Sequence, residues 1–362
     1  MFQQTTFASL CSVQHPIVLA PMAGGVTTPE LVAAVSNAGG LGSLGAGYLS
    51  PAKLREEIKE IRMRTSRPFA VNLFVPGNDN SPDNNVCTEL KTGLKPICDE
   101  LGIEPEELTC AYEDQFEEQF AVIIEERVPV FSFTFGMLAK EKIQKCKQAG
   151  ILTIGTATTV LEAIRLEGSG VDAIVTQGSE AGGHRGTFAH PYHEALIGTM
   201  ALVPQVADHV SIPIIAAGGI MDARGIVASF ALGASAAQMG TAFIPCKESG
   251  AHPLYKDALL RASEDRTAVS QAIKGKAVRG LHNRLMDLVE QMPTTLPYPY
   301  QHALTQKIRQ AAAQQQRPEW MSMWAGQGIR LAKETTVQDF MTEITEGIGK
   351  LLGRLNEIDN RQ

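Results

Sequence analysis

The chain has 362 residues, of which 44% are hydrophobic and 20% are charged, so it can bury a large core and is not disordered as a whole. Its formal net charge of −7 excludes a general binder of nucleic acid or anionic membranes, because neither polyanion is attracted over most of such a surface. Six cysteines without a Cys-x-x-Cys pair, and an N-terminus without a basic leader, favour a soluble, reduced, cytoplasmic chain without zinc or disulfides.

Short apolar runs bounded by glycine or proline recur along the chain and predict eight β-strands. In chain order, the predicted strands cover Ile17 to Ala20, Leu41 to Leu44, Phe69 to Phe74, Val128 to Phe133, Ile151 to Ile154, Ala173 to Thr176, Ile214 to Ala217 and Ala236 to Met239.

Apolar residues at helical spacing lie between these strands and predict helices. Thr28 before Pro29 is a helix start signal, and Gly150 is a stop signal. The predicted helices cover Pro29 to Asn37, Ser50 to Met63, Met137 to Gln148, Thr159 to Glu167, Ala195 to Val210 and Met221 to Leu232. This alternation is typical of an α/β fold, either a closed barrel or a doubly wound sheet, and we favour a (β/α)8 TIM-type barrel.

Two segments do not follow the alternation. Residues 78–127 are too long for a βα loop and contain helical patterns, so they are predicted to be a helical insertion. The predicted barrel therefore comprises residues 1–77 and 128–245. Residues 246–362 are predicted to supply the eighth helix and a C-terminal helical segment that closes over the substrate.

Glycine-rich turns follow four of the predicted strands, at Pro21 to Gly25, Gln177 to Gly186, Gly218-Gly219 and Gly240-Thr241. In a closed barrel these loops meet on the face where active sites of this fold lie, and bare backbone N–H groups there attract phosphate. Neither the Rossmann glycine pattern nor the P-loop pattern is present in the sequence.

Four motifs carry a resemblance to a known family: Val18-Leu-Ala-Pro-Met-Ala-Gly-Gly25, Gln177-Gly-Ser-Glu-Ala-Gly-Gly-His-Arg-Gly186, Ala216-Ala-Gly-Gly-Ile220 and Gln238-Met-Gly-Thr-Ala-Phe243. Together they resemble the nitronate monooxygenases, class I type, formerly called 2-nitropropane dioxygenases. The Glu-Ala-Gly-Gly-His core is shared with flavin-dependent enoyl reductases, whereas Arg185-Gly186 and Trp324-Ala-Gly-Gln-Gly328 are closer to the nitronate enzymes.

The resemblance implies a flavin-binding barrel with non-covalent FMN. It implies that Asn72 and Gln177 hydrogen-bond the flavin ring or ribityl chain and that Met22 passes under the ring. Amide side chains suit this role because they carry both donors and acceptors. The residues implied to hold the ribityl chain and phosphate are Gly182, Gly218, Gly219, Gln238, Met239, Gly240 and Thr241.

His184 is the predicted catalytic residue, because an imidazole on a strand-end loop titrates near neutral pH and can reach a substrate. It is expected to remove the carbon proton of a nitroalkane or to donate a hydrogen bond to nitronate oxygens. A purely structural histidine is the alternative. Glu180 is expected to accept backbone N–H bonds, and Arg185 either aids an anionic substrate or lies in solvent.

The remaining polar residues near these motifs give weaker signals. His190 and His193 lack a familiar ligand spacing, so no metal is predicted. Thr134 stands where many relatives carry a second histidine, and a threonine does not exchange a proton near pH 7. Tyr298, Tyr300 and Lys307 either close over the pocket or only pack and face solvent.

The resemblance implies an FMN-dependent monooxygenase that oxidises alkyl nitronates, including propionate 3-nitronate, with O2 to a carbonyl compound and nitrite. The alternatives are an NAD(P)H-dependent FMN reductase acting on enoyl thioesters or quinones, and a phosphate- or nucleotide-binding module without turnover. The expected partners are a small-molecule nitronate and O2, with no nucleic acid and no membrane. A homodimer stays open.

Overall fold

The computed structural model describes residues 4–77 and 81–359 of the chain. Its main sheet has eight parallel strands in the order β1-β9-β8-β6-β5-β4-β3-β2. A parallel bridge between Val18 and Leu41 joins the two ends of this order, which closes the sheet into a barrel. All eight predicted strands are confirmed: β1 (Ile17–Leu19), β2 (Gly42–Gly45), β3 (Phe69–Phe74), β4 (Val130–Thr134), β5 (Leu152–Ala157), β6 (Ala173–Gln177), β8 (Ile214–Ala217) and β9 (Ala236–Met239).

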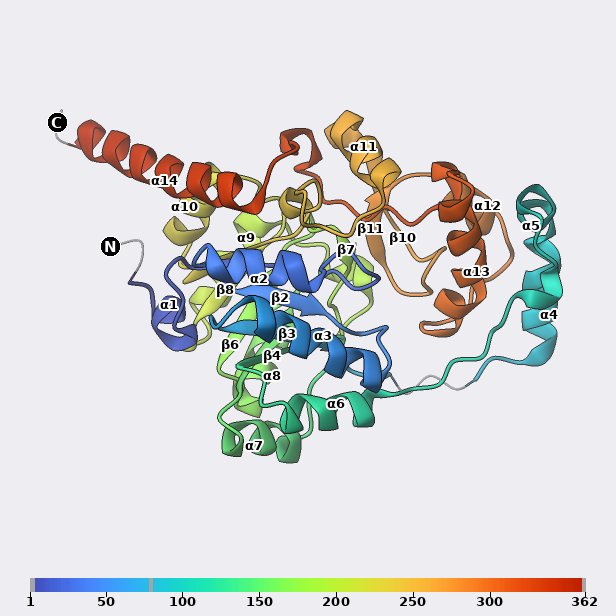
Figure 1. Cartoon of the computed structure of the whole chain (residues 1–362), viewed down its shortest axis with the longest axis horizontal. Helices are drawn as coiled ribbons and strands as arrows, with labels where there is room; N and C mark the ends of the chain where they lie inside the picture. Colours follow the sequence, from blue (N-terminus) through green and yellow to red (C-terminus); the bar gives the residue numbers. More distant parts are fainter. Residues whose placement is uncertain (1–3, 78–80, 360–362) are drawn as a thin grey trace.

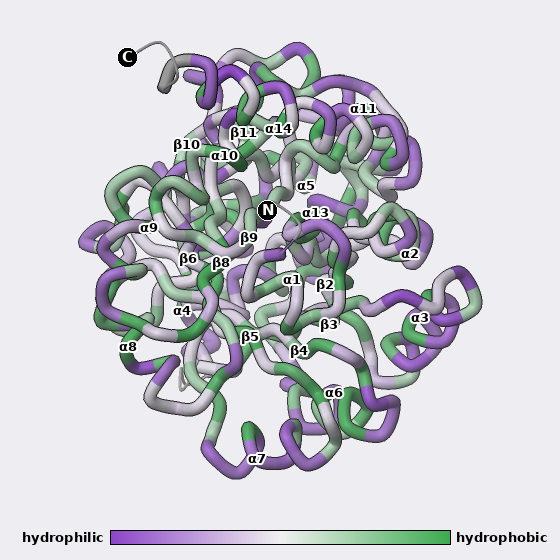
Figure 2. Tube along the Cα trace, turned by 90° about the vertical axis from the view of Figure 1, so that its left-hand side faces the viewer, coloured by the Kyte–Doolittle hydropathy of each residue, from purple (hydrophilic) through white to green (hydrophobic). Residues whose placement is uncertain are grey.

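Eight helices surround the barrel, and the predicted (β/α)8 fold is confirmed (Figure 1). They are α2 (Pro29–Asn37), α3 (Pro51–Arg64), α6 (Phe116–Glu125), α7 (Lys140–Gln148), α8 (Val160–Ser169), α9 (Thr199–Ala207), α10 (Ala223–Ala231) and α14 (Val337–Asp359). The start signal of α2 works as predicted, since the Thr28 hydroxyl accepts from Leu31 N at 3.0 Å. The outer turns of α3 and α7 are hydrophilic in Figure 2, which places their apolar stripes against the strands.

The N-terminal end of the barrel is plugged by α1 (Thr6–Cys11). Phe7 and Cys11 are buried there, in one cluster with interior side chains such as Val18, Val130 and Ala236. Because apolar side chains fill this end, a ligand has access to the barrel only from the opposite end.

Two excursions leave the carboxyl ends of β3 and β9. The first contains α4 (Asn84–Gly93), α5 (Lys95–Leu101) and η1 (Pro105–Glu107). The second contains η3 (Thr241–Phe243), α11 (Pro253–Arg261), η4 (Glu264–Arg266), β10 (Thr267–Ser270), β11 (Val278–Leu281), α12 (Arg284–Glu290), α13 (Tyr300–Gln314), η5 (Pro318–Trp320) and η6 (Ile329–Leu331).

Residues 84–108 and 241–331, called the cover here, share a hydrophobic cluster of their own. Ile97 of α5 and Leu304 of α13 are both fully buried in it, and Figure 1 shows α4 and α5 beside α12 and α13. In contrast, Phe116 and Phe120 of α6 belong to the barrel core, so the segment 78–127 includes one barrel helix. The predicted division into barrel, insertion and C-terminal segment otherwise stays a prediction.

A second, three-stranded sheet has the order β10-β11-β7, where β7 (Gly183–His184) comes from the loop after β6. The barrel and the cover are therefore hydrogen-bonded to each other through this loop. Within residues 4–77 and 81–359, no helix combines the length and apolar composition needed to cross a membrane.

Candidate active site

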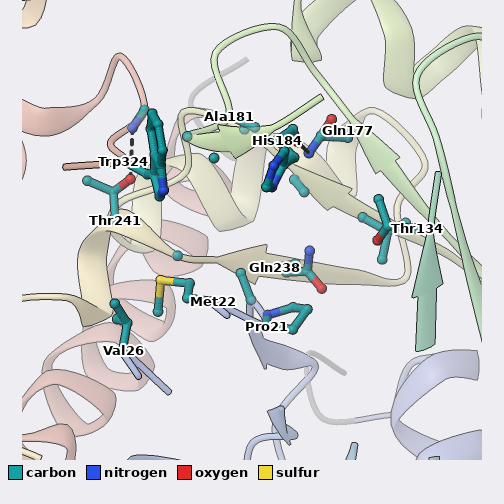
Figure 3. Close-up of a pocket in the computed structure, with 18 of the residues that line it drawn as sticks. Pro21, Met22, Val26, Thr134, Gln177, Ala181, His184, Gln238, Thr241 and Trp324 are labelled. Carbon is teal, nitrogen blue, oxygen red and sulfur yellow. Dashed lines mark hydrogen bonds between the residues drawn. The ribbon is translucent and has the colours of Figure 1, made fainter. Parts of the chain in front are cut away.

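One cavity lies at the carboxyl ends of the barrel strands, beneath the cover. Its wall includes nearly all of the predicted site residues: Met22, Asn72, Gln177, Gly182, His184, Gly218, Gly219, Gln238, Gly240 and Thr241. In Figure 3, His184 and Trp324 lie across the pocket from Pro21 and Met22. The space between these two walls is therefore bounded by residues from three separate parts of the chain.

Met239 is the predicted site residue whose side chain does not line the cavity. It is 1% exposed and packs in the core between strands and helices. Successive side chains of a strand point to opposite faces, so Gln238 faces the barrel interior and Met239 faces outward. A contact from Met239 to a ligand is therefore restricted to its main chain.

Glycine turns, which expose main chain without side chains, form part of the cavity wall. Gly218 has φ +119 and Gly219 has φ +71, a conformation that favours glycine. At Gly182, a Cβ atom would lie 2.6 Å from the main chain of Ala325, so only glycine lets these two loops approach. The hydroxyl of Thr241 accepts from Gly326 N at 2.9 Å and fixes the same contact.

The loop that carries His184 is tied to β6 by Gln177. The Gln177 Nε2 donates to His184 O at 2.9 Å, and Gly186 N donates to Gln177 Oε1 at 2.9 Å. On its other edge, β7 pairs with β11, with Val278 opposite His184. The main chain of His184 is thus restrained from two sides.

Two charged residues hold the same loop. Thr199 N donates to both carboxylate oxygens of Glu180 at 2.9 Å, as expected for a loop-shaping acceptor. Arg185 is 1% exposed and donates to three carbonyl oxygens, those of Gly178 at 2.6 Å, Gln177 at 3.1 Å and Ala195 at 3.2 Å. Neither of its expected placements is found, because the guanidinium is buried and both of its Nη atoms donate to main-chain carbonyls.

Aromatic rings surround the imidazole of His184. Phe135, Phe74 and Tyr298 make edge contacts with it at 5.1, 5.5 and 5.7 Å between ring centroids. Its Nε2 is buried and has no hydrogen-bond partner among the described residues. Burial, and then the charges of Lys274, Lys276 and Arg309, hold the pKa of His184 well below its ordinary value. The imidazole is therefore uncharged near neutral pH.

A cluster of buried basic side chains lies behind the cavity wall, and the sequence did not predict it. Lys274 Nζ donates to His302 Nδ1 at 2.7 Å, and Arg309 Nη2 donates to the same nitrogen at 3.0 Å. The His302 ring stacks on the cavity residue Tyr48 at 4.3 Å. Burial, followed by these neighbouring charges, lowers the pKa of His302. No motif marks these residues, because the cover brings them together only in the folded chain.

The other candidates are spread between the cavity and the surface. Thr134 lines the cavity, 3.4 Å from the Thr156 hydroxyl. Lys307 instead forms an ion pair with Glu107 at 2.8 Å on the surface of the cover. Tyr300, at the start of α13, is partly buried beside the cover cluster and is not among the residues that line the cavity.

His190 and His193 lie away from His184, next to Glu194, with nitrogen-to-oxygen distances of 3.7 and 3.9 Å. Both side chains are exposed, with 37% and 66% of their surface accessible. In the part of the chain that the structure describes, no group of three or more histidine, cysteine or carboxylate side chains is placed to hold a metal ion.

The sequence of the chain is similar to those of known proteins. The sequence model of the nitronate monooxygenase family matches residues 5–347. The chain is 46% identical to a probable nitronate monooxygenase of Staphylococcus haemolyticus and 43% identical to one of Staphylococcus aureus strain Newman, in both cases over 97% of this chain and 99% of the relative.

Two solved structures share the fold and much of the sequence. Nitroalkane oxidase from Streptomyces ansochromogenes has a TM-score of 0.88 at 38% identity, covering 96% of this chain and 99% of that one. FabK from Thermotoga maritima has a TM-score of 0.77 at 31% identity, covering 98% and 99%.

Proposed function

The chain belongs to the nitronate monooxygenase family, and from this premise we propose that it oxidises alkyl nitronates with O2, releasing a carbonyl compound and nitrite. The proposed cofactor is FMN, and propionate 3-nitronate is among the proposed substrates. The observation that carries the proposal is the position of His184 in the wall of a cavity at the barrel mouth, where its buried Nε2 has no hydrogen-bond partner among the described residues.

The residues present fit a flavin mononucleotide. The positive φ angles of Gly218 and Gly219 leave bare main chain at the wall, which suits the close approach of a phosphate. The amide of Gln238 makes no hydrogen bond among the described residues, so it is free to meet a polar ring edge. Asn72 donates to Ser132 Oγ at 3.0 Å and keeps a carbonyl oxygen for a ligand. When bound, FMN supplies the electron acceptor for the substrate.

The protein's own part is to orient the substrate and to move or hold a proton. An uncharged imidazole carries one acceptor nitrogen and one donor nitrogen, so His184 can accept a proton from the carbon of a nitroalkane or donate a hydrogen bond to a nitronate oxygen. The rings of Phe74, Phe135 and Tyr298 pack around the imidazole, whose Nε2 is buried, and a hydrogen bond made in such a site is stronger than one made in water.

The test begins with the chromophore of the purified protein. We expect FMN to be released on denaturation, and nitrite and a carbonyl product to form when a nitronate is added in air. His184→Asn should retain the flavin and lose about 10²- to 10⁴-fold in turnover, the usual contribution of a general acid or base. A protein that binds no flavin, or a variant with full turnover, contradicts the proposal.

An NAD(P)H-dependent reductase is the second candidate, and the likeness to FabK over 98% of the chain favours it. Anaerobic mixing separates the two candidates. Under the first proposal a nitronate bleaches the flavin and NADH does so slowly. Rapid bleaching by NADH, with no reaction toward a nitronate, would establish the reductase instead.

A further inference from the structure

The side chain of Gln177 takes the place of a neighbouring strand. In a parallel ladder, one residue bonds to the C=O before and the N–H after the residue opposite it. The Gln177 amide makes this pair of bonds around Arg185, to His184 O and from Gly186 N, each at 2.9 Å. The short segment 184–186 therefore has a surrogate strand on its barrel side.

The opposite edge of the segment is a true strand pairing. Arg185 N donates to Ala277 O at 2.8 Å, and Val278 of β11 lies opposite His184. The Arg185 side chain adds bonds to Gly178 O and Gln177 O, which bind the segment to the end of β6. Among the described residues, however, only the Gln177 amide donates to the carbonyl of His184 itself on the barrel side.

Gln238 provides a contrast in the same cavity. It has the same carboxamide and lies at the same level of the barrel, since Ala217 of β8 pairs with Gln177 of β6 and with Gln238 of β9. The Gln238 carboxamide, however, makes no hydrogen bond within residues 4–77 and 81–359. One glutamine of the wall is thus available to a ligand, whereas the other is engaged with the main chain that carries the imidazole.

We propose that Gln177 is a positioning residue that sets the imidazole of His184 through the main chain of residues 184–186. The catalytic part of this inference rests on the function proposed above. Gly183 has φ +77 and no side chain, so the segment preceding His184 has little stiffness of its own. The flavin contact that the resemblance implies for Gln177 stays a prediction, and the flavin affinity of the variants below tests it.

The experiment compares two chemically identical changes, Gln177→Glu and Gln238→Glu. A glutamate at 177 can still accept from Gly186 N. It cannot donate to His184 O, so a carboxylate oxygen and a carbonyl oxygen face and repel each other. We expect Gln177→Glu to lower kcat by about 10- to 100-fold, as a small misplacement of a catalytic group does, with unchanged flavin affinity. Gln238→Glu is expected to weaken flavin binding.

A second readout does not depend on turnover. The ring signals of His184 in ¹⁵N-histidine-labelled protein, assigned by their loss in His184→Asn, should shift in Gln177→Glu and stay in place in Gln238→Glu. Gln177→Met, which removes both bonds at similar length, should shift them as well.

The proposal is overturned if Gln177→Glu leaves the His184 signals unmoved, whether or not flavin binding weakens. A wild-type protein that does not turn over nitronates refutes the proposed function instead, and the signals still decide the role of Gln177.

Discussion

Burial and the nearby charges determine the protonation state of the His184 imidazole. Burial is the largest cause of its lowered pKa, followed by Lys274, Lys276 and Arg309. Since the folded-state pKa lies below the ordinary value of about 6.5, acidification protonates the unfolded chain first. The contribution of His184 to stability is therefore complete above that ordinary value and is lost as pH falls below it toward the folded-state pKa.

Lys274→Met tests this electrostatic account. Lys274 is 3% exposed, and a methionine of similar length removes its charge without opening a cavity. We expect the pKa of His184 to rise, so that the acid limb of kcat/KM moves to higher pH. The measurement is the pH profile together with the titration of the His184 ring signals. Lys145→Met, at an exposed position on α7, is the control and should move neither.

The site residues that belong to sequence motifs were predicted from the sequence. Those that become neighbours only through tertiary packing were missed. His184 and the glycines at 218 and 219 stand at strand ends, so parallel strands bring them to one rim. Lys274, His302 and Arg309 belong to the cover, where no repeating pattern relates them to the barrel. Arg185 was misplaced because a buried arginine and an exposed one look alike in a sequence.

The loop between β6 and α9 is held by two carboxylates from different directions. Glu180 accepts at the start of α9, and Glu162 of α8 reaches the same loop from the other side. Glu162 is fully buried; its Oε2 accepts from Thr158 N and Oγ1, both at 2.7 Å, and its Oε1 accepts from Phe188 N at 2.6 Å and Ala189 N at 2.9 Å. Every oxygen of this side chain therefore faces donors.

Glu162→Gln changes the shape of the side chain little, but it should destabilise the loop between β6 and α9 strongly. The new NH2 group must face N–H or O–H donors, and a buried unsatisfied donor costs about 1–3 kcal/mol. We expect a lower Tm and faster hydrogen exchange in residues 186–190. Glu141→Gln, in the exposed first turn of α7, serves as the matched substitution. Equal Tm values for the two variants contradict the role of Glu162.

Elements with local patterns were predictable, and pairings between distant segments were not. The boundaries of α2 were predicted to the residue, because the cap Thr28, Pro29 and the apolar spacing all lie within or directly before the helix. The sheet β10-β11-β7 was not predicted, since Arg279 and Gly183 become neighbours only when the cover folds onto the barrel. A two-residue strand such as β7 has too few residues for any alternation to be seen.

The two largest hydrophobic clusters of the described residues lie in the barrel and in the cover, and a third fills the N-terminal end of the barrel. Ile58 of α3 is fully buried in the first, and Leu304 of α13 is fully buried in the second. Because the chain leaves the barrel after β3 and again after β9 to build the cover, both excursions must be in place before the second core is complete.

Truncating one side chain in each core tests whether the two are separable. Leu304→Ala and Ile58→Ala should each cost about 2–5 kcal/mol. We expect Leu304→Ala to raise hydrogen exchange across the cover while the barrel strands stay protected, and to reduce turnover. Ile58→Ala should raise exchange around α3. Equal loss of protection in both cores after Leu304→Ala would show that they unfold as one unit.

The pairing of β7 with β11 makes the histidine part of the cover as much as of the barrel. Any displacement of the cover relative to the barrel would therefore also displace the main chain of Gly183 and His184. The geometry of the imidazole is in this way coupled to the seating of the cover.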